Sequence, residues 1–301
     1  MNTIQASKTK DIKGAVFSMA GGCCWGLSGS MGQFLFQHEG MDSRWLVPIR
    51  LGLAGIILLL FCMVKYGRKT VFKIWKDKTD RRDLVIYGLF GVSFCQFLYF
   101  LTIQLSTAGV GTILQDLSPV MILLYGCITK KRKPGVRQII AIIMALIGVM
   151  LITTHGNFAH TSVPLAALLT GVLCAVGVMI YNVTPGRLME RFPVVLMQGW
   201  SFIMGSIFIG AVFHPWTYNY VPSAIGIAGI AFVVIVGNVL AFPLYITGVK
   251  YIGPDKGILY GFSEPVTAAI ISTFLLGSPF TIWDGVGFVL IFLMLALIGK
   301  M

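Results

Sequence analysis

The chain has 301 residues, of which 56% are hydrophobic and only 11% are charged, and its formal net charge is +12. Soluble domains carry about 25% charged residues, so this composition excludes an ordinary soluble protein. It predicts an all-α integral membrane protein, because a stretch of roughly 20 apolar residues is long enough to cross the hydrocarbon core.

Ten apolar segments follow one another along the chain, and the connections between them are short. We predict transmembrane helices at 14–36, 45–64, 84–105, 108–129, 138–154, 164–184, 194–213, 223–249, 254–276 and 281–299. Residues 1–12 are polar and the first apolar segment is too long for a typical secretory signal, so we interpret it as the first helix. Function must therefore lie within or between the helices.

The basic residues are distributed unevenly between the two sides of the predicted bundle. With the N-terminus inside, all but two of the 23 lysine and arginine residues fall on the inner side, the exceptions being Arg44 and Arg50. This is the positive-inside pattern, so we predict a multi-pass protein of the cell (plasma) membrane with both termini in the cytoplasm. Topology thus accounts for the positive charge, and we expect no nucleic-acid partner.

The chain also contains the same segment twice. Residues 97–152 and 243–298 align without a gap, and the basic loop 130–133 has an uncharged counterpart in the second copy. Because each half holds an odd number of spans, the second copy must enter the bilayer upside down. We predict two inverted five-helix repeats, 1–155 and 156–301, an architecture found in secondary transporters.

Two acidic residues lie near the middle of predicted spans. Asp116 and Glu264 would each cost at least about 2.5–3.5 kcal/mol in the membrane unless protonated, paired or facing water. Such residues commonly line substrate or proton pathways, and a neutral carboxyl bonded between helices is the alternative. Pro119 and Pro265 follow them, and we predict helix kinks there because proline removes a backbone hydrogen bond.

Aromatic and amide residues complete the candidate site. Trp25 lies in mid-span, away from the interfacial belt where tryptophan is common. A mid-membrane indole needs a partner for its N–H or a cavity to face, and packing between helices is the alternative. Tyr260 is expected to share a helical face with Glu264. Besides the two carboxylates, the predicted solute-binding residues are Trp25, Tyr99, Gln115, Asn238, Tyr245 and Tyr260.

Arg50 is a separate candidate near the outer end of the second span. It is a possible outer-mouth contact for a substrate carboxylate, with snorkelling of the side chain to the interface as the alternative. The six cysteines lie in spans, which argues against a disulfide framework, and the four histidines lack metal-ligand spacing. We predict no metal site, no cofactor and no catalytic residues.

These features resemble a known family. Trp25-Gly26, Arg50, the segment from Ser106 to Pro119, and Gly285-x-Gly287 with the apolar run after it appear in the order seen in EamA-type members of the drug/metabolite transporter (DMT) superfamily. The resemblance covers nearly the whole chain. It implies a ten-helix transporter with a central cavity lined by both halves. It also implies solutes such as amino acids, other metabolites or toxic amphiphiles, often moved outward.

We therefore predict a secondary transporter of small polar or amphipathic organic solutes, such as amino acids or amine-like metabolites. It would work by alternating access, with export favoured; protons are a candidate for the coupling ion, which the sequence does not identify. An importer or facilitative uniporter of a small nutrient, such as an organic cation, is the alternative. A channel would need rings of carbonyls or charges, and a membrane-embedded enzyme would need clustered nucleophiles or metal ligands. The sequence shows no such enzyme constellation. Inverted repeats can also build channels, but the family resemblance favours a transporter. The sequence sets no oligomeric state.

Overall fold

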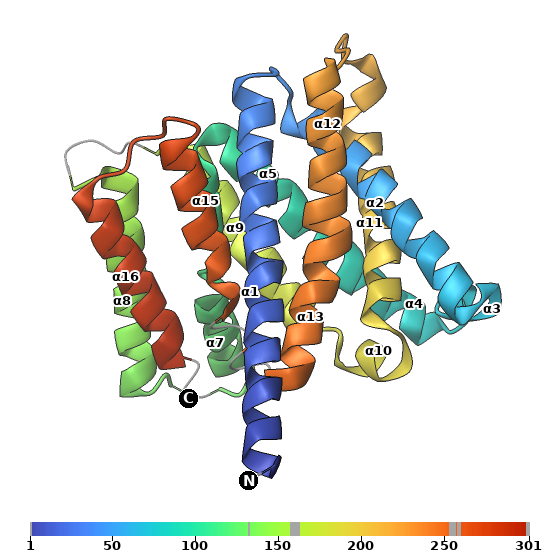
Figure 1. Cartoon of the computed structure of the whole chain (residues 1–301), viewed down its shortest axis with the longest axis horizontal. Coiled ribbons are helices and arrows are strands. Elements are labelled where there is room, and N and C mark those ends of the chain that lie inside the picture. The colour runs from blue at the N-terminus through green and yellow to red at the C-terminus, as the bar shows by residue number, and fades with distance from the viewer. Residues whose placement is uncertain (1, 132, 157–162, 253–256, 258–259, 299–301) are drawn as a thin grey trace.

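The computed structural model describes the chain except residues 1, 132, 157–162, 253–256, 258–259 and 299–301. Its described part is a bundle of helices without strands (Figure 1). The first half contains α1 Asn2–Gln37, α2 Ser43–Tyr66, α3 Arg68–Lys73, α4 Lys78–Val85, η1 Ile86–Ser93, α5 Phe94–Leu105, α6 Ala108–Gln115, α7 Ser118–Thr129 and α8 Val136–Thr154. The second half contains α9 Leu165–Val183, α10 Gly186–Arg191, α11 Val194–Phe213, η2 Pro215–Thr217, α12 Ala224–Phe232, η3 Val233–Leu240, α13 Ala241–Ile252, α15 Ser263–Phe274 and α16 Ile282–Ile298.

Seven helical stretches of the described residues are long and apolar enough to cross a membrane. They are 43–66, 78–105, 108–129, 136–154, 165–183, 194–213 and 224–249. These coincide with seven of the predicted spans. The predicted spans 14–36, 254–276 and 281–299 remain predictions, and α16 contains a shorter apolar helix, Ile282–Leu297. Part of span 254–276 lies outside the described residues.

Among these seven stretches the largest difference in bounds is at the third span, which we predicted to begin at residue 84. Helix α4 starts six residues earlier because the Asp77 side chain accepts hydrogen bonds from the backbone N–H groups of Thr79 and Asp80. This cap satisfies two of the N–H groups that a helix start leaves free. The basic first turns are therefore helical although they are too polar for the hydrocarbon core.

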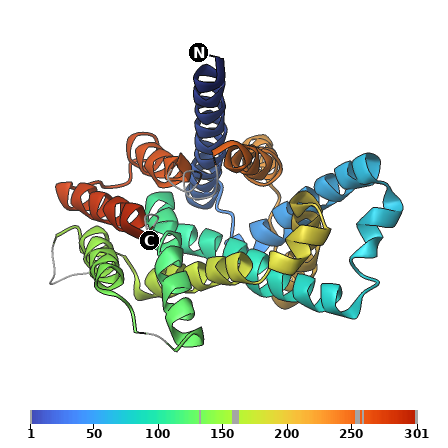
Figure 2. The same ribbon diagram turned by 90° about the horizontal axis from the view of Figure 1, so that it is seen from below.

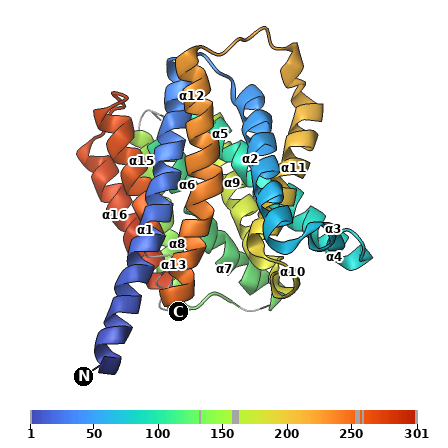
Figure 3. The same ribbon diagram turned by 45° about the vertical axis from the view of Figure 1, so that its right-hand side comes forward.

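Helices of the first half pack mainly against helices of the second. Helix α2 packs along α11, and α8 packs along α16. Helix α1 lies between α13 and α15, as Figures 1 and 3 show, and α5 packs against α9. Under the predicted repeat, α2 is equivalent to α11 and α8 to α16. Likewise α1 is equivalent to α9 and α13 to α5, so the contact of α1 with α13 corresponds to the contact of α9 with α5. Such reciprocity is what a two-fold relation between the halves requires.

Two spans are broken at matching places. In the fourth span, α6 ends at Gln115 and α7 begins at Ser118, while in the ninth α15 begins at Ser263 after a turn at Phe262. Pro119 and Pro265 lie in the first turns of α7 and α15, where a missing N–H has no helical partner to lose. We predicted that these prolines kink continuous helices. They do not, because each span has already stopped and restarted as a new helix before its proline.

Two π-helical segments also occupy similar places in the two halves. η1 spans Ile86–Ser93 in the third span, and η3 spans Val233–Leu240 in the eighth. Segments of this kind are rare and occur frequently at functional sites. η3 contains Asn238, one of the predicted site residues.

Glycines allow α1 to approach α15 closely at the helix break. A Cβ atom on Gly22 would lie 2.8 Å from the carbonyl oxygen of Gly261, and one on Gly26 would lie 2.5 Å from that of Glu264. Both distances are too short for a side chain. Small residues on α1 therefore set how near its backbone comes to Glu264.

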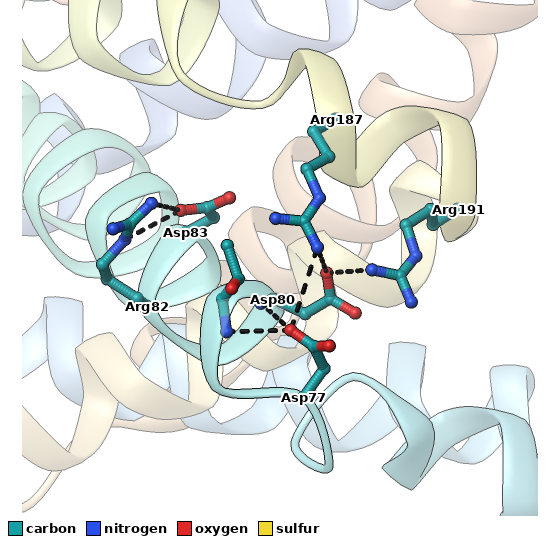
Figure 4. Close-up of polar contacts among 7 residues, drawn as sticks. Asp77, Asp80, Arg82, Asp83, Arg187 and Arg191 are labelled. Carbon is teal, nitrogen blue, oxygen red and sulfur yellow. Dashed lines mark hydrogen bonds and ion pairs between the residues drawn. The ribbon is translucent and has the colours of Figure 1, made fainter.

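An ionic cluster joins the two halves (Figure 4), toward the end of the bundle where α1 begins (Figure 1). The carboxylate of Asp80 on α4 is 1% exposed and accepts hydrogen bonds from two arginines of α10, Arg191 at 2.6 Å and Arg187 at 3.3 Å. Arg187 also lies 3.8 Å from Asp77. Hydrogen bonds from the backbone N–H groups of Asp80 and Thr79 hold the pKa of Asp77 below its ordinary value. We call Asp77, Asp80, Arg187 and Arg191 the ionic latch.

We expect Asp80→Asn to destabilise the protein by about 1–3 kcal/mol, because two arginines would lose the buried carboxylate that they share. Asp83→Asn is the matched control. Asp83 pairs with Arg82 at 3.0 Å, and the Arg82 side chain is 70% exposed, so its loss should cost less than about 1 kcal/mol. Thermal melting of the purified variants measures both. Equal melting temperatures for the two variants would contradict a stabilising latch.

We expect Gly26→Ala to cost about 1–3 kcal/mol, because the new methyl group must displace α15 at Glu264. Gly126→Ala in α7 is the control, since a Cβ there meets nothing within 4 Å. The control should be neutral or stabilise the helix by up to about 1 kcal/mol. The same melting measurement separates them. An unchanged Gly26→Ala variant would mean that α1 and α15 are not in close contact.

Candidate functional site

The central feature of the candidate site is a contact between the two halves at a helix break. Glu264 lies in the first turn of α15, and the buried hydroxyl of Tyr99 on α5 donates a hydrogen bond to its Oε1 atom at 3.4 Å. A helix N-terminus favours negative charge on such a group. The structure thus brings together two predicted site residues that are far apart in the sequence, one from each half.

An aromatic pair lies between α1 and α13. The rings of Trp25 and Tyr245 have centroids 5.3 Å apart, and that of Phe242 lies 6.4 Å from Trp25. Trp25 and Tyr245 are both half-buried, so neither ring is fully enclosed by packing. The Tyr245 ring also faces the α15 segment, because a Cβ on Gly261 would lie 3.2 Å from it. The aromatic surface therefore adjoins the break that carries Glu264.

The second carboxylate lies at the other helix break. Asp116 directly follows α6, and its buried Oδ2 atom has no hydrogen-bond partner among the described residues. Asp116 lies within electrostatic range of Glu264, Tyr99 and Tyr245. The arrangement gathers two acidic groups and two tyrosines around the breaks of α6 and α15.

Gln115 occupies a different environment from Asp116. Its Oε1 atom accepts weak hydrogen bonds from the thiols of Cys95, at 3.8 Å, and Cys174, at 3.7 Å. The two sulfur atoms lie 3.6 Å apart, and all six cysteines are free thiols. The amide is therefore partly occupied by protein groups on α5 and α9.

Arg50 does not lie at the outer mouth, where we predicted it, and it does not snorkel to the interface. Its side chain is 1% exposed. It donates hydrogen bonds to Asn238 at 3.1 Å and to the side chain of Gln96 at 2.6 Å, and its guanidinium stacks 3.6 Å over the Phe100 ring. These neutral partners on η3 and α5 bind its two terminal nitrogens, whereas the buried Nε atom has no hydrogen-bond partner among the described residues. Arg50 and Asn238 therefore form one cluster that links the halves.

Tyr260 is not part of the aromatic pair. Its side chain is 38% exposed, and it makes no ring contact with Trp25 or Tyr245 within the described chain. The turn at Phe262 interrupts the helix between Tyr260 and Glu264, so the helical face that we predicted for them does not continue through the span. After the break, α15 has its own buried face, which includes Ala268 and Ser272.

Sequence reasoning missed an amide cluster at the opposite end of the bundle from the ionic latch. Fully buried Gln33 of α1 accepts hydrogen bonds from the backbone N–H of Ala108 and from the hydroxyl of Ser272, both at 2.8 Å. It donates to Ser278 at 2.9 Å. Gln33 and Gln96 are polar residues inside apolar spans, which is the signal that would have identified both.

Comparison with known proteins shows which family the chain resembles. A model of the EamA-like transporter family matches the chain twice, over residues 12–154 and 165–300. The chain is 33% identical over 279 residues to an uncharacterized inner membrane transporter of Salmonella typhimurium, YicL, covering 93% of this chain and 92% of that one. It is 26% identical over 254 residues to the uncharacterized transporter YyaM of Bacillus subtilis, covering 81% and 80%.

A solved structure supports the fold alone. A protein crystal structure superposes with a TM-score of 0.63 at 15% identity and covers 94% of this chain and 95% of that one. The two family matches cover nearly all of both halves, and the relatives above carry the names of transporters rather than enzymes. The chain therefore belongs to the EamA-like transporter family and is a multi-pass membrane transporter.

Proposed function

We propose that the protein is a secondary transporter that moves small organic solutes bearing an ammonium group, such as amino acids or amines. The observation that carries this proposal is the contact between Tyr99 of one half and Glu264 of the other at a helix break. Helix breaks at mid-membrane are where secondary transporters hold substrates and coupling ions. A carboxylate there supplies charge to an ammonium group, and nearby aromatic faces add cation–π attraction.

Each site residue has a proposed role. Glu264 and Asp116 are the carboxylates, and Tyr99 orients Glu264. Trp25 and Tyr245 form the aromatic wall beside the α15 break. The Arg50–Asn238 cluster holds α2 against η3, and Gln115 and Tyr260 are peripheral members of the site. Pairs of carboxylates near one another also offer a place for a coupled proton.

The proposed mechanism is alternating access by two inverted halves, 1–155 and 156–301. The two separate matches to the family model and the reciprocal helix pairs support this division. Opening the site to one side must separate helices of different halves, so contacts between the halves must break and reform. The proposed direction, export, rests on the family resemblance alone. A measurement of flux would separate a carrier from a channel, because only a carrier saturates at low turnover.

We expect Glu264→Gln to fold normally and to lose binding of an ammonium solute by about 10–100-fold, because a charge-assisted hydrogen bond contributes about 1.5–3 kcal/mol. The measurement is thermal stabilisation by a panel of amino acids and aromatic amines, followed by uptake into proteoliposomes. Glu190→Gln on α10 is the control, since Glu190 is exposed and outside the site. Unchanged binding and transport in Glu264→Gln would assign that carboxyl a structural role.

We propose that both termini face the cytoplasm, and labelling tests this orientation. A cysteine at Lys76 should react with an impermeant thiol reagent only after permeabilisation, and one at Tyr218 should react in intact cells. The cysteine at Lys76 follows α3, and the one at Tyr218 lies between α11 and α12, at opposite ends of the bundle. The reverse pattern would overturn the orientation and leave the fold unaffected.

A further inference from the structure

A strongly basic arm projects at one edge of the molecule. It consists of residues 65–76, which form the end of α2, helix α3 and the turn before α4 (Figure 1). Seen from below, this light-blue to cyan segment lies at the edge farthest from α8 and α16 (Figure 2). The arm contains no acidic residue. Its basic residues, all exposed, are Lys65, Arg68, Lys69, Lys73 and Lys76.

The charge of this arm is not neutralised by the protein. None of its five basic residues forms an ion pair with another described residue. The nearest acidic residues along the chain are already engaged. Asp77 and Asp80 belong to the ionic latch, and Asp83 pairs with Arg82. The arm is therefore a surface of uncompensated positive charge.

The arm is fixed to the bundle rather than being a loose loop. Val71 and Ile74 are fully buried, and the indole N–H of Trp200 on α11 donates a hydrogen bond to the Val71 carbonyl oxygen at 3.0 Å. The ring of Trp75 lies 5.2 Å from that of Trp200 in an edge-to-face arrangement. One face of α3 is thus buried, and its basic side chains project from the other side.

The arm begins where an exposed apolar surface of α2 ends. On α2, Phe61 is 49% exposed and Val64 is 89% exposed. The ammonium group of Lys65 lies 5.4 Å from the Phe61 ring, and the guanidinium of Arg68 lies 5.9 Å from the Phe72 ring. The surface thus changes from exposed apolar residues to aromatic rings with cations beside them. This is the order expected on passing from the hydrocarbon core of a membrane to its headgroups.

We propose that the basic arm is a docking surface for the phosphate headgroups of anionic phospholipids. Charge complementarity selects this partner, because each lysine or arginine near an anionic membrane surface contributes to attraction and the arm has no acid of its own. The apolar surface of α2 that adjoins the arm places these cations at headgroup level. Bound lipid would cover α3 and hold the arm against α11, so it should stabilise the folded protein.

The experiment titrates purified full-length protein in neutral detergent with phosphatidylglycerol or phosphatidylcholine and follows the melting temperature. Phosphatidylglycerol should raise it more than phosphatidylcholine does. The triple variant Arg68→Gln, Lys69→Gln, Lys73→Gln should bind phosphatidylglycerol about 100-fold more weakly. The matched control is Lys130→Gln, Lys131→Gln, Lys133→Gln, which removes the same charge from the other basic loop and should retain the lipid effect.

Each other outcome overturns the proposal. An equal loss in both triple variants would show attraction to net charge without a defined surface. No loss in the arm variant, or an equal response to both lipids in the wild type, would show that the arm is not the lipid site. If the arm variant does not fold, Lys69→Gln and Lys73→Gln alone are measured, each with an expected loss of about fivefold. Wild-type affinity in both single variants would then contradict the assignment.

Discussion

The structure depends on one constraint, which is that a polar group inside the membrane is costly unless it finds a partner within the protein or faces a water-filled cavity. Glu264 meets it through three features together. The span breaks before Ser263, so the carboxyl lies at a helix N-terminus. Tyr99 of the other half donates a hydrogen bond to it, and Gly26 lets the backbone of α1 approach it. The position of α1 between α13 and α15 follows from the same close approach.

The two ends of the bundle are held by different chemistry. Buried Gln33 joins α1, α6 and the end of α15 through neutral hydrogen bonds. At the other end the ionic latch joins α4 to α10 through charged groups, and its arginines are partly exposed. Salt screens exposed charges and leaves buried amide bonds nearly unaffected. Ionic strength should therefore weaken the exposed Arg187–Asp77 pair more than the pairs that the arginines make with buried Asp80.

Much of this fold was predictable from the sequence, because hydropathy alone located seven spans that the structure contains. The structure places Tyr99 beside Glu264, and the role of both residues in binding stays a prediction. The predicted position of Arg50 at the outer mouth was wrong. It rested on the place of Arg50 in its span, whereas Gln96 and Asn238, which bind its side chain, come near it only in the folded bundle. The predicted kinks at Pro119 and Pro265 and the predicted helical face of Tyr260 assumed that each span is one continuous helix. Both spans are broken, so these predictions failed.

The two halves share an arrangement and differ at the site. Both contain a π-helical segment and a broken span at matching places, and helix pairs recur reciprocally. The carboxylates at the breaks are nevertheless in unequal environments. Glu264 is bonded to Tyr99, whereas Asp116 has a buried oxygen without a protein partner. Two related halves that alternate must be unlike in any one conformation, since a fully symmetric arrangement would open equally to both sides. Under the proposed mechanism, the unequal carboxylates would be the local form of that asymmetry, at the proposed solute site.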